Sequence, residues 1–110
     1  MKLAIVGSRN LTNIVLDTYI SEEVKEIVSG GAAGVDFCAA KYAEENGLKL
    51  TEFLPEYKRY GRAAPIVRNK KIVDYADKII VFWNESSKGT RSVIQYAKKI
   101  GKPLEVILCK

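Results

Sequence analysis

Five short apolar runs, separated by segments with helical patterns, are the feature that most constrains how this chain folds. The runs lie at 3–6, 24–28, 48–54, 78–83 and 104–108. The first and fourth are continuously apolar rather than alternating, which is typical of strands buried on both faces. Strands that alternate with helices form parallel sheets through right-handed crossovers. The sequence therefore predicts an α/β, Rossmann-like three-layer sandwich with a five-stranded parallel sheet in the order 3-2-1-4-5.

Four helices are predicted between these strands, at 13–20, 32–46, 65–76 and 89–100. The first has apolar residues at 15, 16, 19 and 20, the spacing of a short amphipathic helix. The basic, tyrosine-bearing stretch 56–64 is predicted to be an irregular loop. A chain of 110 residues suits one domain, here residues 1–110, without a disulfide or a metal to stabilise it.

The composition narrows the chemistry that the chain can perform. It has two cysteines and no histidine, so no Ser-His or Cys-His nucleophile pair can form. The same absence argues against a zinc site, and we expect neither a metal nor a cofactor. The apolar run after Met1 is too short for a membrane span and has no signal-peptide cleavage pattern. We therefore expect a cytoplasmic protein without a membrane partner.

The net charge of +5 is unevenly distributed along the chain. Residues 1–57 contain five Lys or Arg and nine Asp or Glu, whereas residues 58–110 contain thirteen and four. Six of the positive side chains lie between Lys58 and Lys71, where there is no acid. Such a stretch either attracts phosphates or is a solvated surface, and the sequence leaves both interpretations open.

Three loops with small or polar residues follow predicted strands, at 7–9, 29–34 and 86–90. The predicted strand order brings them to one edge of the sheet, at the switch point where ligands of such folds bind. Glycine lets a ligand approach backbone amides, and helix N-termini favour anions. The predicted ligand-binding residues are Gly7, Ser8, Arg9, Ser29, Gly30, Gly31, Ala32, Gly34, Asp36, Arg68, Asn69, Ser87, Gly89 and Thr90.

Several of these residues have two interpretations. Asp36 either accepts ribose hydroxyls or complements a helix dipole. Arg9 either binds a phosphate or is an ordinary surface arginine. Asn69 is a poor helix former in a predicted helix, which favours a specific role. Trp83 either stacks on a base or packs beneath a loop or at a subunit interface.

In several blocks the sequence resembles the SLOG superfamily, most closely its small stand-alone YspA-like domains. The blocks are Val6-Gly7-Ser8-Arg9, Ser29-Gly30-Gly31-Ala32-x-Gly34-x-Asp36, Tyr60-Gly61 through Arg68-Asn69, Ala76-Asp77, and Phe82-Trp83 followed by Ser87-x-Gly89-Thr90. That Rossmann-like superfamily includes the DNA-processing protein DprA and the LONELY GUY phosphoribohydrolases. The resemblance implies a site for nucleotides or molecules derived from them.

The resemblance also bears on catalysis. The segment 87–90 falls where the phosphoribohydrolases carry Pro-Gly-Gly-x-Gly-Thr-x-x-Glu, and Val93 stands in place of the catalytic glutamate. Arg68 stands roughly where those enzymes have an arginine. Since half of the catalytic pair is missing, we assign no catalytic residue, and the enzyme interpretation is the weaker one.

These observations lead to three functional hypotheses and one on assembly. The first is a module that senses or sequesters a phosphate-containing molecule derived from a nucleotide. The second is a hydrolase of the N-glycosidic bond in a nucleotide, with Asp36 or Glu85 replacing the missing glutamate. The third is binding of single-stranded nucleic acid through 58–71, with stacking on Tyr57, Tyr60 or Trp83. We also expect a homodimer, formed through aromatic residues that include Phe82 and Trp83.

Overall fold

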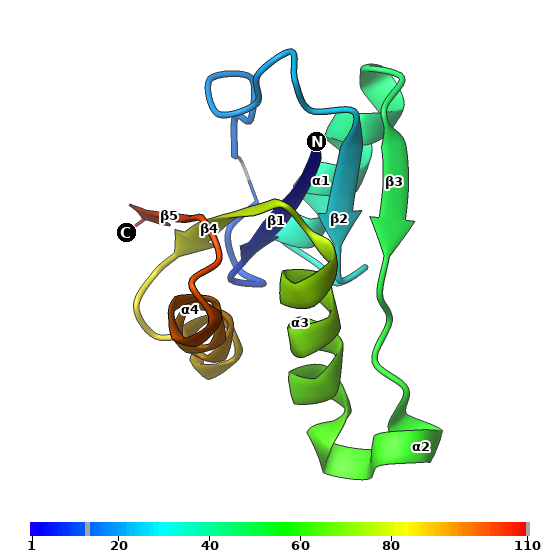
Figure 1. Cartoon of the computed structure of the whole chain (residues 1–110), viewed down its shortest axis with the longest axis vertical. Coiled ribbons are helices and arrows are strands. Elements are labelled where there is room, and N and C mark those ends of the chain that lie inside the picture. The colour runs from blue at the N-terminus through cyan, green and yellow to red at the C-terminus, as the bar shows by residue number, and fades with distance from the viewer. Residues whose placement is uncertain (13, 110) are drawn as a thin grey trace.

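The computed structural model of the chain has a five-stranded parallel sheet in the order β3-β2-β1-β4-β5, which confirms the predicted order (Figure 1). It describes residues 1–12 and 14–109. The strands are β1 (Lys2–Gly7), β2 (Glu26–Ser29), β3 (Lys49–Glu52), β4 (Lys78–Trp83) and β5 (Leu104–Leu108). The two continuously apolar runs, β1 and β4, are central neighbours, and the middle four residues of each are buried.

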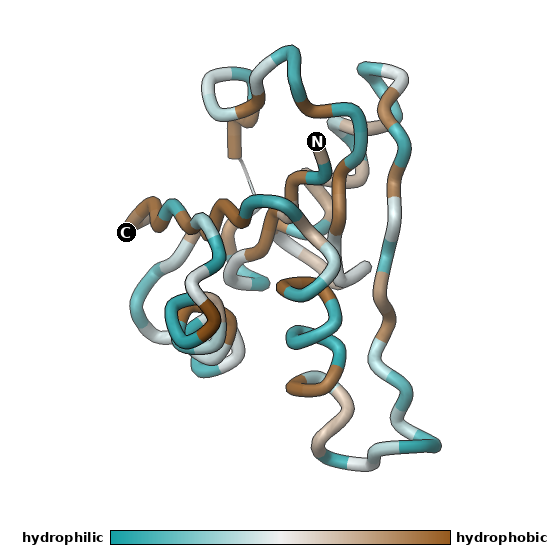
Figure 2. The backbone as a smooth tube through the Cα atoms, viewed as in Figure 1, coloured by the Kyte–Doolittle hydropathy of each residue, from teal (hydrophilic) through white to brown (hydrophobic). Residues whose placement is uncertain are grey.

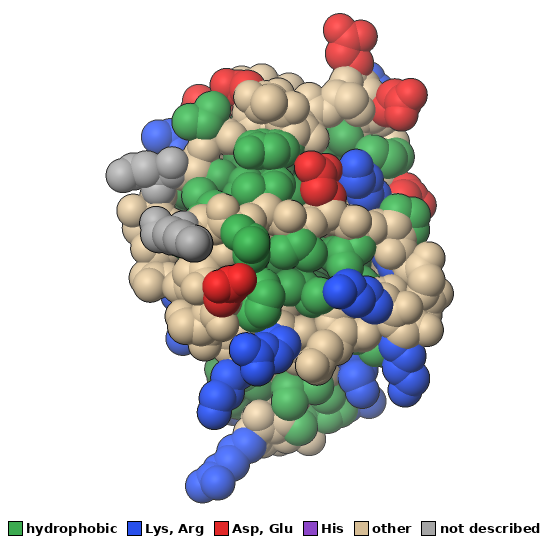
Figure 3. All heavy atoms as spheres, turned by 90° about the vertical axis from the view of Figure 1, so that its left-hand side faces the viewer, with side chains coloured by type: hydrophobic (Ala, Val, Ile, Leu, Met, Phe, Trp, Pro, Cys, Tyr) green, Lys and Arg blue, Asp and Glu red, His purple; other side chains and the backbone are tan. Residues whose placement is uncertain are grey.

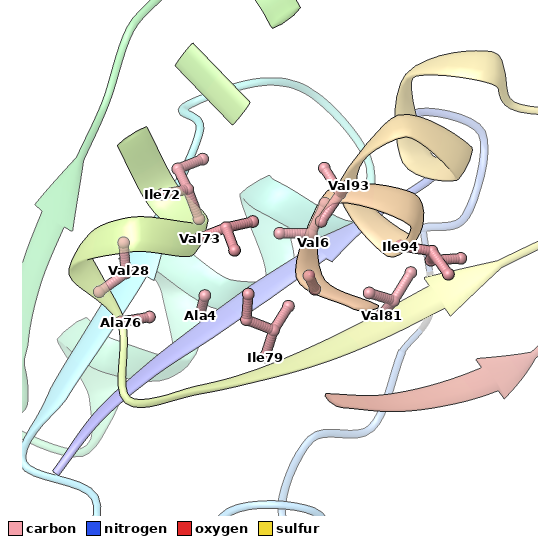
Figure 4. Packing of buried hydrophobic residues seen from close by; sticks show 11 residues of the cluster. Ala4, Val6, Val28, Ile72, Val73, Ala76, Ile79, Val81, Val93 and Ile94 are labelled. Atoms are coloured by element: carbon pink, nitrogen blue, oxygen red, sulfur yellow. The ribbon is translucent and has the colours of Figure 1, made fainter. Parts of the chain in front are cut away.

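Helices cover both faces of the sheet, and together they make the predicted three layers. Helix α1 (Val35–Glu45) lies on one face, whereas α3 (Ala64–Tyr75) and α4 (Lys88–Ile100) lie side by side on the other (Figure 1). Because side chains alternate along a strand, each central strand contributes to two cores. Ala4 and Val6 face α3 and α4 (Figure 4), whereas Leu3 and Ile5 face α1.

The helix predicted at 13–20 is wrong for the residues that the structure describes. Asn13 lies outside the described residues, and 14–20 form an irregular segment with a turn in which the Tyr19 N–H bonds the Leu16 carbonyl at 2.9 Å. Leu16 is buried in the core beside α1, but Val15 is 68% exposed. Five of the seven residues from 14 to 20 are β-branched or aromatic and are weak helix formers, so the segment covers the sheet without forming a helix.

Other boundaries shift by a few residues. The helix predicted from Ala32 begins at Val35, because Gly34 has a positive φ of 70° that a helix does not allow. Strand β3 is shorter than the predicted 48–54. The stretch predicted as an irregular loop contains α2 (Tyr57–Tyr60) and the 3₁₀ helix η1 (Gly61–Ala63). These short helices lie beyond the edge of the sheet, at the bottom of Figure 1.

The two outer strands of the sheet differ in character. Strand β3 carries Lys49 and Glu52, whereas β5 has an exposed Val106 and Leu108. Figure 3 shows hydrophobic side chains gathered on the side of the molecule that carries β5. Phe82 is 1% exposed, so it cannot belong to an apolar surface for dimer formation as the sequence suggested. No helix in the described part of the chain is long and apolar enough to span a bilayer.

The central position of β4 predicts a large stability cost for truncating its side chains. Ile80 is 1% exposed and packs in the core beside α1. We expect Ile80→Ala to lower the free energy of unfolding by about 2–5 kcal/mol, measured by urea denaturation followed by circular dichroism. Ile66→Ala, at a side chain that is 50% exposed on α3, is the control and should change it by less than about 1 kcal/mol. Equal losses in the two variants would contradict this view of the core.

We propose that the chain forms a homodimer through the free edge of β5. An antiparallel pair of identical strands satisfies both unpaired edges and covers Val106 and Leu108 in each copy. Val106→Lys should yield a monomer of 12.3 kDa in sedimentation equilibrium, while the wild type gives twice that mass. Leu50→Lys on β3 is a matched control, since Val106 and Leu50 are both 36% exposed on an edge strand. A wild-type protein that stays monomeric at high micromolar concentration would disprove the dimer.

Candidate functional site

A cavity of about 380 Å³ opens at the carboxyl ends of the central strands. Parallel pairing sets its position, because Gly7 of β1 lies opposite Phe82 of β4 and the loops after both strands leave the same edge. Eleven of the fourteen predicted site residues line the cavity: Gly7, Ser8, Arg9, Gly30, Ala32, Asp36, Arg68, Asn69, Ser87, Gly89 and Thr90. The structure therefore brings together residues from all three predicted loops and from α3.

The other three predicted residues, Ser29, Gly31 and Gly34, do not line the cavity. Ser29 is fully buried, and its Oγ accepts a bond from the Gly31 N–H at 3.4 Å. Gly34 has a positive φ, and a Cβ there would collide with the Arg9 carbonyl, so glycine lets the loops after β1 and β2 touch. A Cβ on Gly31 would meet Leu54 rather than the cavity. These residues shape the loop instead of facing a ligand.

Arg68 forms the wall of the cavity on the α3 side, with only 9% of its surface exposed. Its Nη1 donates to the Gly30 carbonyl oxygen at 2.7 Å, and its Nε donates to Asn69 Oδ1 at 2.9 Å. Burial lowers the pKa of the guanidinium, which the nearby Asp36 carboxylate partly offsets. Among the residues that the structure describes, none accepts a hydrogen bond from Nη2. This group therefore retains donors for a ligand.

The side chain of Asn69, a poor helix former, makes two hydrogen bonds. Its Oδ1 accepts from Arg68, and its Nδ2 donates to the Gly89 carbonyl oxygen at 3.4 Å. One side chain thus orients the arginine and joins α3 to the first turn of α4. An aliphatic residue with better helix propensity could make neither bond.

Asp36 is buried at the N-terminus of α1, on the side of the cavity formed by the loop after β2. Its Oδ2 accepts a hydrogen bond from the Ala32 N–H at 3.2 Å. Burial raises the pKa of the carboxyl group, although the Ala32 bond and the charge of Arg68 act in the opposite direction. The carboxylate occupies the position at this helix end that an anion would take. The glycine loop after β2 is therefore a poor site for a phosphate.

The N-terminus of α4 differs from that of α1 in that no carboxylate from the described part of the chain occupies it. Ser87 caps the helix, since its Oγ accepts from the Thr90 N–H at 3.3 Å, and the first turn contains no acid. The N–H groups of Lys88 and Gly89 find no partner among the described residues, as is usual in a first helical turn. A Cβ on Gly89 would meet nothing within 4 Å, so the backbone is open to the cavity. This end of the cavity suits an anion.

Asn84, which the sequence analysis did not single out, holds the two central loops together. Its Oδ1 accepts from Ser8 Oγ at 3.1 Å and from the Ser86 N–H at 3.0 Å, and its Nδ2 donates to Asn10 Oδ1 at 2.9 Å. The available signal was an asparagine directly after a strand, because Asn side chains bond backbone amides two residues onward. The cavity residues that the prediction missed are Val6, Asn10, Pro65, Ile72, Asn84 and Ser86.

The cavity holds few groups for catalysis. Asp36 is the one carboxylate among the described residues that line it. Val93, which stands where the phosphoribohydrolases have glutamate, is 1% exposed and packs in the core beneath α4 rather than lining the cavity. Glu85 does not line it either. Within the described residues, no three His, Cys, Asp or Glu side chains cluster as a metal site requires.

Comparisons of the chain with protein-family models, with curated proteins and with solved structures find no match. The similarity to the SLOG superfamily therefore stays a prediction. What can be concluded about function comes from the cavity itself.

We expect the buried carboxylate of Asp36 to lower the stability of the folded protein. Because the folded protein raises its pKa, ionisation of Asp36 destabilises the fold at every pH above that raised value. We expect Asp36→Asn to unfold at a higher temperature than the wild type at pH 7. The difference should disappear below about pH 4, where the carboxyl is protonated in the folded and the unfolded chain alike. A variant that is less stable at pH 7 would show that Asp36 serves the fold rather than a ligand.

Proposed function

We propose that this protein binds a phosphate-bearing small molecule derived from a nucleotide, which it senses or sequesters. The observation that carries the proposal is the acid-free N-terminus of α4, which opens into a cavity walled by the buried Arg68. Unpaired helix amides and a guanidinium are the groups that recognise phosphate in proteins. Arg9, which is exposed and lines the same cavity, adds a third positive group.

The two ends of the cavity differ in charge and therefore favour one orientation of the bound ligand. A phosphate is favoured at Lys88 and Gly89 and disfavoured near Asp36, because like charges repel. The Asp36 carboxylate favours hydrogen-bond donors, such as the hydroxyls of a ribose. A ligand with a phosphate at one end and a sugar toward the other matches this arrangement. The resemblance to a superfamily that binds nucleotides supports the same choice.

The size of the cavity supports a small ligand. Ligand pockets commonly enclose about 300–1,000 Å³, and 380 Å³ lies at the lower end of that range. Two free cysteines, Cys38 and Cys109, support the expectation of a reducing compartment such as the cytoplasm.

A second candidate is hydrolysis of the N-glycosidic bond in a nucleotide. Asp36 favours it, because a carboxyl whose pKa is raised by burial is suited to general acid-base catalysis. The absence of a second carboxylate among the described cavity residues favours the binding function. Release of free base from nucleoside monophosphates, lost in Asp36→Asn, would reverse this ranking.

Isothermal titration with adenosine and guanosine 5′-monophosphates tests the binding function. We expect binding to require both the phosphate of the ligand and the residues of the cavity. Arg9→Ala removes one charged hydrogen bond worth roughly 1.5–3 kcal/mol, so affinity should fall by about ten- to a hundredfold. Gly89→Glu should weaken binding at least as much. It places a carboxylate at the anion end, yet the fold should tolerate it because that position faces open space.

Two controls complete this experiment. Lys99→Ala removes the same charge from the last turn of α4, far from the cavity, and should leave affinity unchanged. Adenosine without a phosphate should bind much more weakly than its monophosphate. Wild-type protein that gives no heat with any mononucleotide, or equal affinity for adenosine, would disprove the proposal.

A further inference from the structure

The chain projects beyond the sheet between β3 and α3 (Figure 1). We call α2 and η1 together, residues 57–63, the overhang. It lies at the bottom of Figure 1, beyond the carboxyl ends of β2 and β3, and much of it is hydrophilic in Figure 2. Arg62 precedes by three residues Pro65, which lines the cavity. The two Cα atoms are therefore at most about 11 Å apart.

The overhang carries positive charge that the described part of the chain leaves largely free. Lys58, Arg59 and Arg62 are exposed, and the sequence has no acid from 57 to 73. The adjoining acid, Glu56, already pairs with Lys71 at 3.2 Å and lies 3.9 Å from Arg59. Lys58 and Arg62 have no ion pair among the described residues. These cations extend the positive character of the cavity outward.

Two tyrosines stand among these cations. Tyr57 is 57% exposed, so its ring is accessible for stacking. The ring of Tyr60 lies 5.1 Å from the Arg59 guanidinium and 5.6 Å from Lys71 Nζ. Alternating cations and exposed aromatic rings are the means by which proteins hold single-stranded nucleic acid, through phosphate pairing and base stacking.

This inference rests on the proposed function of the cavity. We propose that the ligand is a short single-stranded oligonucleotide with a terminal 5′-phosphate. The cavity receives the terminal phosphate and its nucleotide, and the overhang binds the phosphates and bases that follow. Because the Arg62 and Pro65 Cα atoms are at most about 11 Å apart, an oligonucleotide of a few nucleotides is long enough to reach from the cavity to Arg62. The cavity is too small to take more than the first of them.

The test compares adenosine 5′-monophosphate with 5′-phosphorylated oligodeoxyadenylates of two and four nucleotides, by isothermal titration at low salt. We expect the tetranucleotide to bind at least tenfold more tightly than the monophosphate. The double variant Lys58→Ala/Arg62→Ala should remove that gain and leave the affinity for the monophosphate unchanged. Loss of two phosphate contacts should also reduce the slope of log affinity against log salt by about 1.4.

The matched control is Lys98→Ala/Lys99→Ala, which removes the same charge at the other end of α4 and should change neither affinity. A tetranucleotide that binds no more tightly than the monophosphate would overturn the role of the overhang while leaving the cavity site intact. Inorganic polyphosphate binding as tightly as the tetranucleotide would overturn the nucleotide class. If the monophosphate itself fails to bind, the proposed function fails, and this extension fails with it.

Discussion

The parallel pairing of β1 with β4 is the interaction on which the rest of this structure depends. The two strands are adjacent in space although 70 residues of sequence separate the end of one from the start of the other. Their pairing places Ile5 beside Ile80 and commits one face of each strand to each core. Strands β2 and β3 extend the sheet on one side of β1, whereas β4 and β5 extend it on the other side. The loops after β1 and β4 consequently diverge, and the cavity lies where they part.

Buried polar groups around the cavity satisfy one another instead of being left unpaired. Arg68, Asn69 and Ser8 are each less than a tenth exposed, and each has a hydrogen bond to another loop or helix. Thr90 is equally buried, and its Oγ1 accepts from Ser87 Oγ at the start of its own helix. Within the described residues, no buried side-chain nitrogen or oxygen lacks a partner. Such groups contribute little net stability when they are paired, and they cost much when they are not. Their concentration at one edge of the sheet supports the proposal of a ligand site there.

The sequence predicted the sheet well, because continuous apolar runs have few alternatives to a buried parallel strand. It also located most of the cavity, since strand order alone decides which loops meet. The helix at 13–20 failed because apolar spacing does not distinguish a helix from an irregular segment that buries one residue, Leu16. The sequence could not predict the role of Asn84 or the orientation of a ligand in the cavity, because both depend on side-chain hydrogen bonds between loops. The glycine loop after β2 was predicted to bind the ligand together with two other loops, yet its Ala32 N–H already donates to the carboxylate of Asp36.

The bonds of Asn84 have a consequence for how a ligand is received. Its side chain links the loop after β1 to the loop after β4 through Ser8, Asn10 and Ser86. The walls of the cavity are thus preorganised, and little conformational entropy remains to be lost on association. We therefore expect the cavity walls to change little when a ligand binds, so that affinity depends on the groups that already line the cavity.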